Sequence, residues 1–475
     1  MKGLKIHHLA MLTVILAYAG GSFGLGAEKE SLVPIRMEEA VAIAKKNNPE
    51  FRVALQRQRA DAEKVNQAWG SLWPIIESEA SVLRQRADSG FLSISDGQYD
   101  IKVVQVKFGI NPGMFYHTLQ MTRKASAASS EEVRRVGSEI EQNVIECYFN
   151  LLLAEEMIRL RKETIALLNE NLKDVGNLYR TGSVPKYDLL QAQVQLKSQE
   201  PLLIDAENKR RLAIELFNFH LGLDERKYTA DPSVLSRTEF PVAEDDIDAF
   251  VNRVGRVALK NRPEVMQLKI KKEVAGHAKW VSRSLYLWPT FTAGGYYGYQ
   301  RPLPNISEAY IPTTGGFGYM DMSRIAGKDK WQPNWQVRIA ATYRWGSLAP
   351  FDSSRSQARE AAARENEAEE ELRRVTRLIT ISLKSTYANL LTASRSIASH
   401  RENVEKAREG MRIARESYRA GVIKNADLAG AQVALTEAQA GYLNAVNAYY
   451  QSLAKLRREI GVADDSVIFG GKGDE

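Results

Sequence analysis

The sequence predicts a mostly α-helical protein that also carries strands of the membrane β-barrel type, and three observations lead to this fold class. First, a helix–turn–helix unit occurs twice, and the same offset of 239 positions separates Tyr148 from Tyr387 and Gly222 from Gly461. Second, the arms of each unit repeat apolar residues every seven positions. Third, short segments between the units alternate apolar and polar residues. The fixed offset indicates rigid rods that lie side by side, because flexible linkers do not keep their length so strictly.

The N-terminal residues 1–26 are predicted to form a secretory signal peptide. Lys2 and Lys5 precede an apolar run at 9–19, which small residues follow. The run is too short for an ordinary transmembrane helix. The single cysteine, Cys147, excludes an intramolecular disulfide, a cysteine metal cluster and a lipid-modified cysteine at the cleavage site. We expect an exported chain in which Cys147 is a packed free thiol.

Composition argues against nucleic-acid binding and against catalysis. The formal charge is +7 on a chain that is 26% charged, and basic and acidic residues are interspersed along the predicted helices, as on solvated faces. The six histidines are scattered. No phosphate loop, metal-ligand spacing or nucleophile constellation is visible in the sequence. We therefore expect no enzyme, no catalytic residue, no cofactor and no metal site.

A second, weaker duplication sets the order of elements. Asn47-Asn48-Pro49-Glu50 resembles Asn261-Arg262-Pro263-Glu264, and each motif heads a helix that leads into a pair of strands. The predicted order is a periplasmic helix of the first repeat at 27–72, strands 1 and 2 at 73–110, the first long hairpin at 111–222, a linker at 223–262, the helix of the second repeat at 263–287, strands 3 and 4 with a long outer loop at 288–346, the second long hairpin at 347–462, and a tail at 463–475.

The hairpin arms have the period of a coiled coil. One arm repeats Leu390, Ile397, Val404, Met411 and Tyr418. A spacing of 3.5 residues per apolar position favours left-handed winding, and an arm from near Ser347 to Arg419 would span about 100 Å at 1.5 Å per residue. The last arm carries a further apolar stripe, Val446, Leu453 and Ile460. Two apolar stripes predict neighbours on two sides, as in a ring of helices.

Two regions that begin with Trp73-Pro74 and Trp288-Pro289 interrupt the helices. The clearest strand, at 335–345, alternates strictly and has aromatic residues at both ends of its apolar face, as a membrane-spanning strand does. Its lipid-facing side chains would be Trp335, Val337, Ile339, Ala341, Tyr343 and Trp345. An ordinary half-buried sheet would show a similar alternation.

Residues 75–86, 99–110 and 290–299 are the other strand candidates, and Ala87–Gln98 and Arg301–Asn334 are expected to be loops. Four strands cannot close a membrane barrel, which needs about eight, and an open sheet edge is not viable in lipid. Either the strands lie outside a membrane or several chains share one barrel.

At this point the chain resembles the TolC-like outer-membrane efflux and secretion duct family over nearly all of its mature length. The resemblance rests on the order of elements, on the turns Tyr179–Pro185 and Tyr418–Ile423, and on the Asp-Leu steps at 188–189 and 427–428. It implies a homotrimer in the outer membrane of a Gram-negative-type cell. Four strands per chain would join a shared 12-stranded barrel, and the duplicated hairpins would form an α-barrel tunnel in the periplasm.

The resemblance also implies a function. Such a duct is the passive exit of a tripartite efflux or type I secretion system for small molecules, metal ions or proteins. Its partners would be a periplasmic adaptor and, through the adaptor, an inner-membrane pump. The residues at positions of the adaptor-docking tips are Arg180, Gly182, Ser183, Val184, Arg419, Gly421, Val422 and Ile423.

Asp188, Tyr418 and Asp427 match positions of the family's periplasmic gate. The chain departs from the pattern at Gly430, where some members have a second aspartate, and at Ile423, where some have a basic residue. A weaker gate is therefore implied. Asp427 has a second interpretation, since a carboxylate near a helix N-terminus is favourable without any gate.

Two other classes of protein compete with the duct. A periplasmic adaptor also has a signal peptide and coiled-coil hairpins, but it would show one hairpin flanked by β-rich domains. A structural coiled coil of the envelope would lack strands with the lipid pattern.

Overall fold

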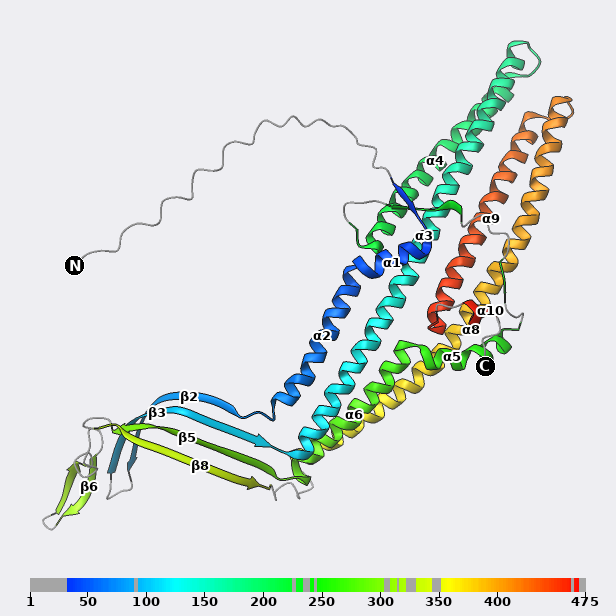
Figure 1. The fold of residues 1–475 in the computed structure, drawn as a ribbon. Coiled ribbons are helices and arrows are strands. Elements are labelled where there is room, and N and C mark those ends of the chain that lie inside the picture. Colours follow the sequence, from blue (N-terminus) through cyan, green and yellow to red (C-terminus); the bar gives the residue numbers. More distant parts are fainter. Residues whose placement is uncertain are drawn as a thin grey trace, which may run out of the picture.

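Figure 1 shows an elongated molecule in which helical hairpins form one end and a β-sheet forms the other. The structure, a computed structural model, describes residues 32–88, 93–223, 228–233, 240–242, 246–302, 308–313, 316–321, 330–343, 352–462 and 465–469. The predicted signal peptide at 1–26 and Trp345 lie outside these residues. No helix of the described part is long and apolar enough to cross a membrane.

Two long hairpins make up most of the chain. The first joins α3 (Pro112–Arg180) to α4 (Lys186–Leu221), and the second joins α8 (Ser353–Arg419) to α9 (Asn425–Ile460). With 69 residues, α3 is about 100 Å long. Both hairpin tips lie at the same end of the molecule, opposite the sheet (Figure 1). The predicted fold class, mostly α-helical with a few strands, is confirmed.

Two shorter helices continue the shorter arms of the hairpins toward the sheet. Helix α2 (Pro49–Gly70) packs on α3 below α4, and α6 (Pro263–Leu287) packs on α8 below α9. Gly222, at the end of α4, abuts the backbone of Asn47, and Gly461, at the end of α9, abuts the backbone of Asn261. In each repeat, the short arm of the hairpin and the shorter helix thus lie end to end. The duplication seen in the sequence is a duplication of this arrangement.

Smaller elements surround the middle of the rods. They are β1 (Val33–Ile35), α1 (Met37–Asn47), β4 (Tyr228–Ala230), α5 (Ile247–Asn261) and α10 (Asp465–Phe469), and β1 pairs with β4 in parallel. The range 223–262 was predicted to be a linker, but it contains β4 and the amphipathic helix α5. Phe250, Val254 and Ala258 of α5 are buried, so hydrophobic burial drives this segment to form a helix.

The core lies where these elements meet the rods. Tyr148 and Tyr387, equivalent in the two repeats, are both fully buried. Tyr387 stacks on Phe250 of α5 with ring centroids 3.6 Å apart. The apolar stripe Val446, Leu453 and Ile460 is buried within the chain, where α9 packs on both α8 and α3. The two neighbours predicted for this helix therefore belong to one chain.

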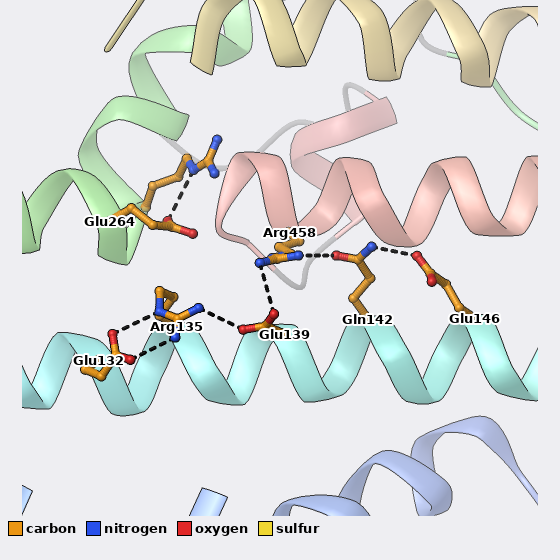
Figure 2. Close-up of polar contacts among 8 residues, drawn as sticks. Glu132, Arg135, Glu139, Gln142, Glu146, Glu264 and Arg458 are labelled. Carbon is orange, nitrogen blue, oxygen red and sulfur yellow. Dashed lines mark hydrogen bonds and ion pairs between the residues drawn. The ribbon is translucent and has the colours of Figure 1, made fainter. Parts of the chain in front are cut away.

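A chain of polar contacts also joins the two repeats at this level, as Figure 2 shows. Arg135 pairs with Glu132 and Glu139 of its own helix α3, each at 2.8 Å. Arg458 of α9 reaches Glu139 at 3.8 Å and donates to Gln142 Oε1 at 2.9 Å. The bases of the two hairpins are thus fixed to one another by charge as well as by apolar packing.

The sheet is antiparallel, and its main strands follow the order β2 (Ile75–Asp88), β3 (Ser93–Ile110), β5 (Thr290–Pro302) and β8 (Gln332–Thr342). Two predicted loops were wrong. Most of Ala87–Gln98 belongs to β2 and β3, and Arg301–Asn334 contains the hairpin of β6 (Glu308–Thr313) and β7 (Gly316–Asp321). Backbone pairing extends the strands beyond their apolar part, so side-chain alternation alone underestimates their length.

A β-bulge in β3 changes which side chains face each side of the sheet. Lys102 pairs with Gly298 and Val104 pairs with Tyr297, so β3 has one extra residue relative to β5. The Ser78 hydroxyl donates to the Val103 carbonyl oxygen at 2.7 Å. The bulge keeps Ile101 on the apolar face with Val104 and turns Lys102 to the polar face.

Candidate functional site: the hairpin tips and the sheet surface

Both hairpin turns close with the same Schellman motif. Gly182 and Gly421 have φ of 75° and 72°, the left-handed region that glycine adopts without steric cost. Ser183 N donates to Leu178 O at 2.8 Å, and Val422 N donates to Ser417 O at 2.9 Å. The glycines thus have a structural role, and the turns leave the Val422 side chain 76% exposed.

The eight predicted tip residues lie at the two turns, at one end of the molecule (Figure 1). They fall into two groups. Arg180, Gly182 and Val422 are exposed and lie outside the cavity between the two tips, whereas Ser183, Val184, Arg419, Gly421 and Ile423 line that cavity. The tip therefore offers an outer surface and an inner space.

The cavity between the tips, here called the inter-tip cavity, has a volume of about 690 Å³. Helices α3, α8 and α9, both turns and the first residues of α4 line it. Two of the three predicted gate residues, Asp188 and Tyr418, are brought together here. Burial of the Tyr418 hydroxyl raises its pKa, and the charges of Asp174 and Asp188 add to the increase.

The third predicted gate residue, Asp427, makes a hydrogen bond within its own helix. Its carboxylate accepts a hydrogen bond from Lys424 N at 3.1 Å and so caps the first turn of α9. Asp427 is not among the residues that line the inter-tip cavity. The alternative interpretation, a carboxylate that stabilises its own helix N-terminus, therefore has direct geometric support.

No sequence pattern pointed to several polar residues that the fold brings close to other elements. Asn171 and Asn425 line the inter-tip cavity. His117 of α3 and His277 of α6, which are 160 positions apart, meet with 3.2 Å between their Nδ1 atoms. Within the described residues, no group of three or more His, Cys, Asp or Glu side chains is arranged to hold a metal ion.

The sheet exposes a broad apolar face. On β8, Trp335, Val337 and Ile339 are 69%, 72% and 84% exposed. Tyr297 on β5, together with Val104 on β3 and Val82 on β2, extends the exposed apolar surface across the sheet. The other face carries ion pairs of Lys107 with Glu77 and of Lys102 with Glu79. One face suits lipid and the other suits water.

Comparison with known proteins agrees with this geometry. Residues 40–217 and 254–462 match the family described as outer membrane efflux protein. A relative, the alkaline protease secretion protein AprF of Pseudomonas aeruginosa, is 20% identical over 448 residues, which cover 92% of this chain and 87% of AprF.

Solved structures show the same fold. The CmeC outer membrane channel of Campylobacter jejuni superposes with a TM-score of 0.71 at 16% identity, covering 90% of this chain and 85% of CmeC. The open-state MtrE outer membrane channel of Neisseria gonorrhoeae gives 0.70 at 16% identity, covering 90% and 89%.

The chain belongs to the outer membrane efflux protein family, a family of transport channels. It is an outer-membrane exit duct that extends into the periplasm and serves efflux or secretion, as the sequence predicted. The chain has two hairpins at one end and the sheet of β2, β3, β5 and β8 at the other, whereas the adaptor alternative required one hairpin flanked by β-rich domains.

Proposed function

We propose that three copies of this chain form a homotrimer and share one 12-stranded barrel in the outer membrane. Each chain contributes β2, β3, β5 and β8, and within the described residues the outer edges of β2 and β8 pair with no other strand. An open edge is not viable in lipid. Three copies would supply twelve strands, enough to close a barrel. The exposed apolar face on this open sheet is the observation that carries the proposal.

The helices also offer a surface for a neighbouring copy. Helix α4 exposes a stripe of large apolar side chains on its outer surface: Tyr187, Leu190, Val194, Leu212, Leu216 and Phe219. Such a stripe on an exported protein is costly in water and typical of a subunit contact. Side-by-side rods from three chains would enclose a tunnel through which substrate passes without covalent chemistry.

Two measurements on detergent-purified protein test the assembly. Native mass spectrometry should give three times the mass of the mature chain. In a planar lipid bilayer the protein should produce discrete conductance steps. A folded protein with the mass of one chain would contradict the shared barrel, and folded trimers that never conduct would contradict an open or weakly gated duct.

The tips are proposed to dock on a periplasmic adaptor coupled to an inner-membrane pump. The exposed Val422 and the polar groups of the turns lie at the end farthest from the sheet, where a partner that spans the periplasm would arrive. A photoreactive amino acid at Val422 should cross-link in cells to one periplasmic protein that has a helical hairpin. The same probe at Ile381, exposed on α8 far from the tip, is the matched control.

A bulky residue at the turn gives an independent test of docking. Gly421→Trp should abolish export in cells while the trimer still forms, because a large side chain at the tip blocks the partner. Normal export by this variant, or equal cross-linking from Val422 and Ile381, would contradict docking at the tips.

Asp188, Tyr418 and Asp427 are proposed to form the periplasmic gate. Support comes from the position of Asp188 and Tyr418 between the tips and from the fixed bases of the hairpins, which leave the tips as the part able to separate. Opening would require contacts that favour the separated tips, such as contacts with the adaptor.

A further inference from the structure

Two histidines from different repeats meet on neighbouring helices. His117 lies on α3 and His277 on α6, and their Nδ1 atoms are 3.2 Å apart. The chain has six histidines, of which His7 and His8 belong to the predicted signal peptide. Two of the other four therefore lie in one contact. Both residues are partly exposed, so water and small ions can reach the pair.

The distance between the two nitrogen atoms fits a shared metal ion. Two imidazole nitrogens in contact can share either a proton or a metal ion. For a hydrogen bond, 3.2 Å is at the long end of the usual range. For a metal ion with bonds to nitrogen of about 2.0–2.1 Å, the same distance gives an angle of about 100–106° at the metal, which is close to tetrahedral.

The surroundings of His117 hold its ring in place and keep it neutral. The ring of Trp280 stacks on it with centroids 5.6 Å apart and 13° between the planes, and Tyr116 contacts it edge-on at 5.1 Å. Burial lowers the pKa of the His117 imidazole, and the charge of His277 adds to the decrease. Because metal ions bind the neutral imidazole, His117 can bind one at pH 7 without first losing a proton.

The ligands available define the class of metal. Among the described residues, no third His, Cys, Asp or Glu side chain joins the pair. Glu273, one turn before His277, pairs instead with Lys124 at 2.6 Å, and Glu365 pairs with Lys279. Water therefore completes the coordination. Two imidazoles favour zinc, nickel and copper, with copper bound most tightly, whereas magnesium and calcium prefer oxygen ligands.

We propose that His117 and His277 bind one divalent ion of the late first transition row, such as Zn²⁺ or Cu²⁺, together with water. The ion joins α3 of the first repeat to α6 of the second, about 8 Å from the start of α3 at Pro112 and so close to the sheet. Such a site was not expected from the sequence, in which 160 positions separate the two residues. The site does not depend on the proposed function, since it needs only the contact between the two helices.

Titration of the untagged, detergent-purified protein with Cu²⁺, followed by electron paramagnetic resonance, tests the site. We expect one tightly bound Cu²⁺ per chain, with hyperfine splitting from two imidazole nitrogens. His117→Gln and His277→Gln should each weaken binding at least about tenfold, because even the loss of an indirect partner of a ligand costs that much. His400→Gln, at a partly exposed histidine of α8, should bind as the parent does.

A parent protein that binds no Cu²⁺ tightly, or variants at both positions that bind it as the parent does, would overturn the site. A second measurement uses the parent alone and so stays valid if the variants do not fold. Diethyl pyrocarbonate modifies neutral histidines, and mass spectrometry locates the product. Zn²⁺ should protect His117 and His277 but not His220 or His400. Equal modification of His117 and His277 with and without Zn²⁺ would also overturn the site, whether or not the protein conducts.

Discussion

Gly222 lies so close to Asn47 that no side chain fits between them. A Cβ placed on Gly222 would stand 2.7 Å from both the carbonyl carbon and the oxygen of Asn47, and φ at Gly222 is +70°. The second repeat has the same arrangement, with a Cβ on Gly461 3.1 Å from the Asn261 carbonyl carbon and φ of +74°. These two contacts join each hairpin to the rod beneath it.

Gly222→Ala should therefore destabilise the protein more than Gly461→Ala. Strain at positive φ and a steric clash with backbone each cost about 1–3 kcal/mol, and the clash at Gly222 is the closer one. Apparent urea midpoints measured at a fixed unfolding time provide the comparison. Gly255→Ala, inside α5 where an added Cβ would lie 4.0 Å from the Val251 side chain, should be neutral or slightly stabilising. A larger loss for Gly461→Ala than for Gly222→Ala would refute this ranking.

The repeat explains why so much of the fold could be predicted. Seven-residue periods and turn glycines are local signals, and they located the hairpins around Gly182 and Gly421. Helix α5 was not predicted. Its amphipathic pattern, in which Phe250 and Val254 are buried, lies between segments rich in proline and acidic residues. The β6–β7 hairpin was not predicted because glycine and proline in 301–334 were interpreted as a loop. These residues indicate turns, but they do not exclude short strands between the turns.

The candidate site was predictable only where local chemistry specified it. A glycine after a helix predicts a left-handed cap, which Gly182 and Gly421 provide. In contrast, the placement of Asn171 and Asn425 around one cavity, and the contact of His117 with His277, depend on how separate rods pack. No pattern along one helix contains that information. The bulge in β3 is similar, because Val103 carries no sequence mark of an extra residue.

Tyr148 should make the stability of the protein depend on pH at the alkaline end. Burial raises the pKa of its hydroxyl to about 12, against about 10 in an unfolded chain. The folded state thus holds the proton more tightly, so this contribution is complete below pH 10 and is lost as the pH rises toward 12. The shift corresponds to roughly 2–3 kcal/mol. Unfolding midpoints between pH 9 and 12 should fall steeply in the parent.

Tyr148→Phe removes this titrating group and also a hydroxyl that donates to Ile35 O at 3.2 Å and accepts from Asp231 N at 3.1 Å. The variant should be less stable at pH 8 by about 1–3 kcal/mol, since buried backbone groups lose their partner. Its midpoint should fall less between pH 10 and 12 than that of the parent. Parallel pH profiles would show that Tyr148 is not the group responsible.

Cys147 should be nearly inert to alkylation in the folded protein. Burial raises the pKa of its thiol to about 11, so about one molecule in a thousand carries a thiolate at pH 8. Iodoacetamide followed by mass spectrometry should show labelling roughly a hundredfold slower in native protein than in urea. Cys147→Ser confirms that the label is on this thiol. Similar rates in both states would mean that the thiol is accessible and ionises normally.

The apolar face of β8 should be required for membrane assembly. Ile339 is 84% exposed, and an arginine on the lipid face near the bilayer midplane costs about 2–4 kcal/mol. Ile339→Arg should reduce the amount of folded trimer recovered from outer membranes. Gln336→Arg, on the opposite face of the same strand, should be tolerated. Equal recovery of the two variants would show that the exposed apolar face does not contact lipid.

Asp427 has two proposed roles, and two substitutions separate them. Asp427→Asn keeps an oxygen that can accept from Lys424 N but removes the charge, whereas Asp427→Ala removes both. If the carboxylate faces the ion path, each variant should lower cation selectivity, measured as the reversal potential in a KCl gradient, because a three-fold ring of negative charge concentrates cations in a narrow throat. If Asp427 only caps α9, reversal potentials should stay at the parent value. Asp427→Ala alone should then lose about 1 kcal/mol of stability, and the negative potential of the gate would have to come from Asp188.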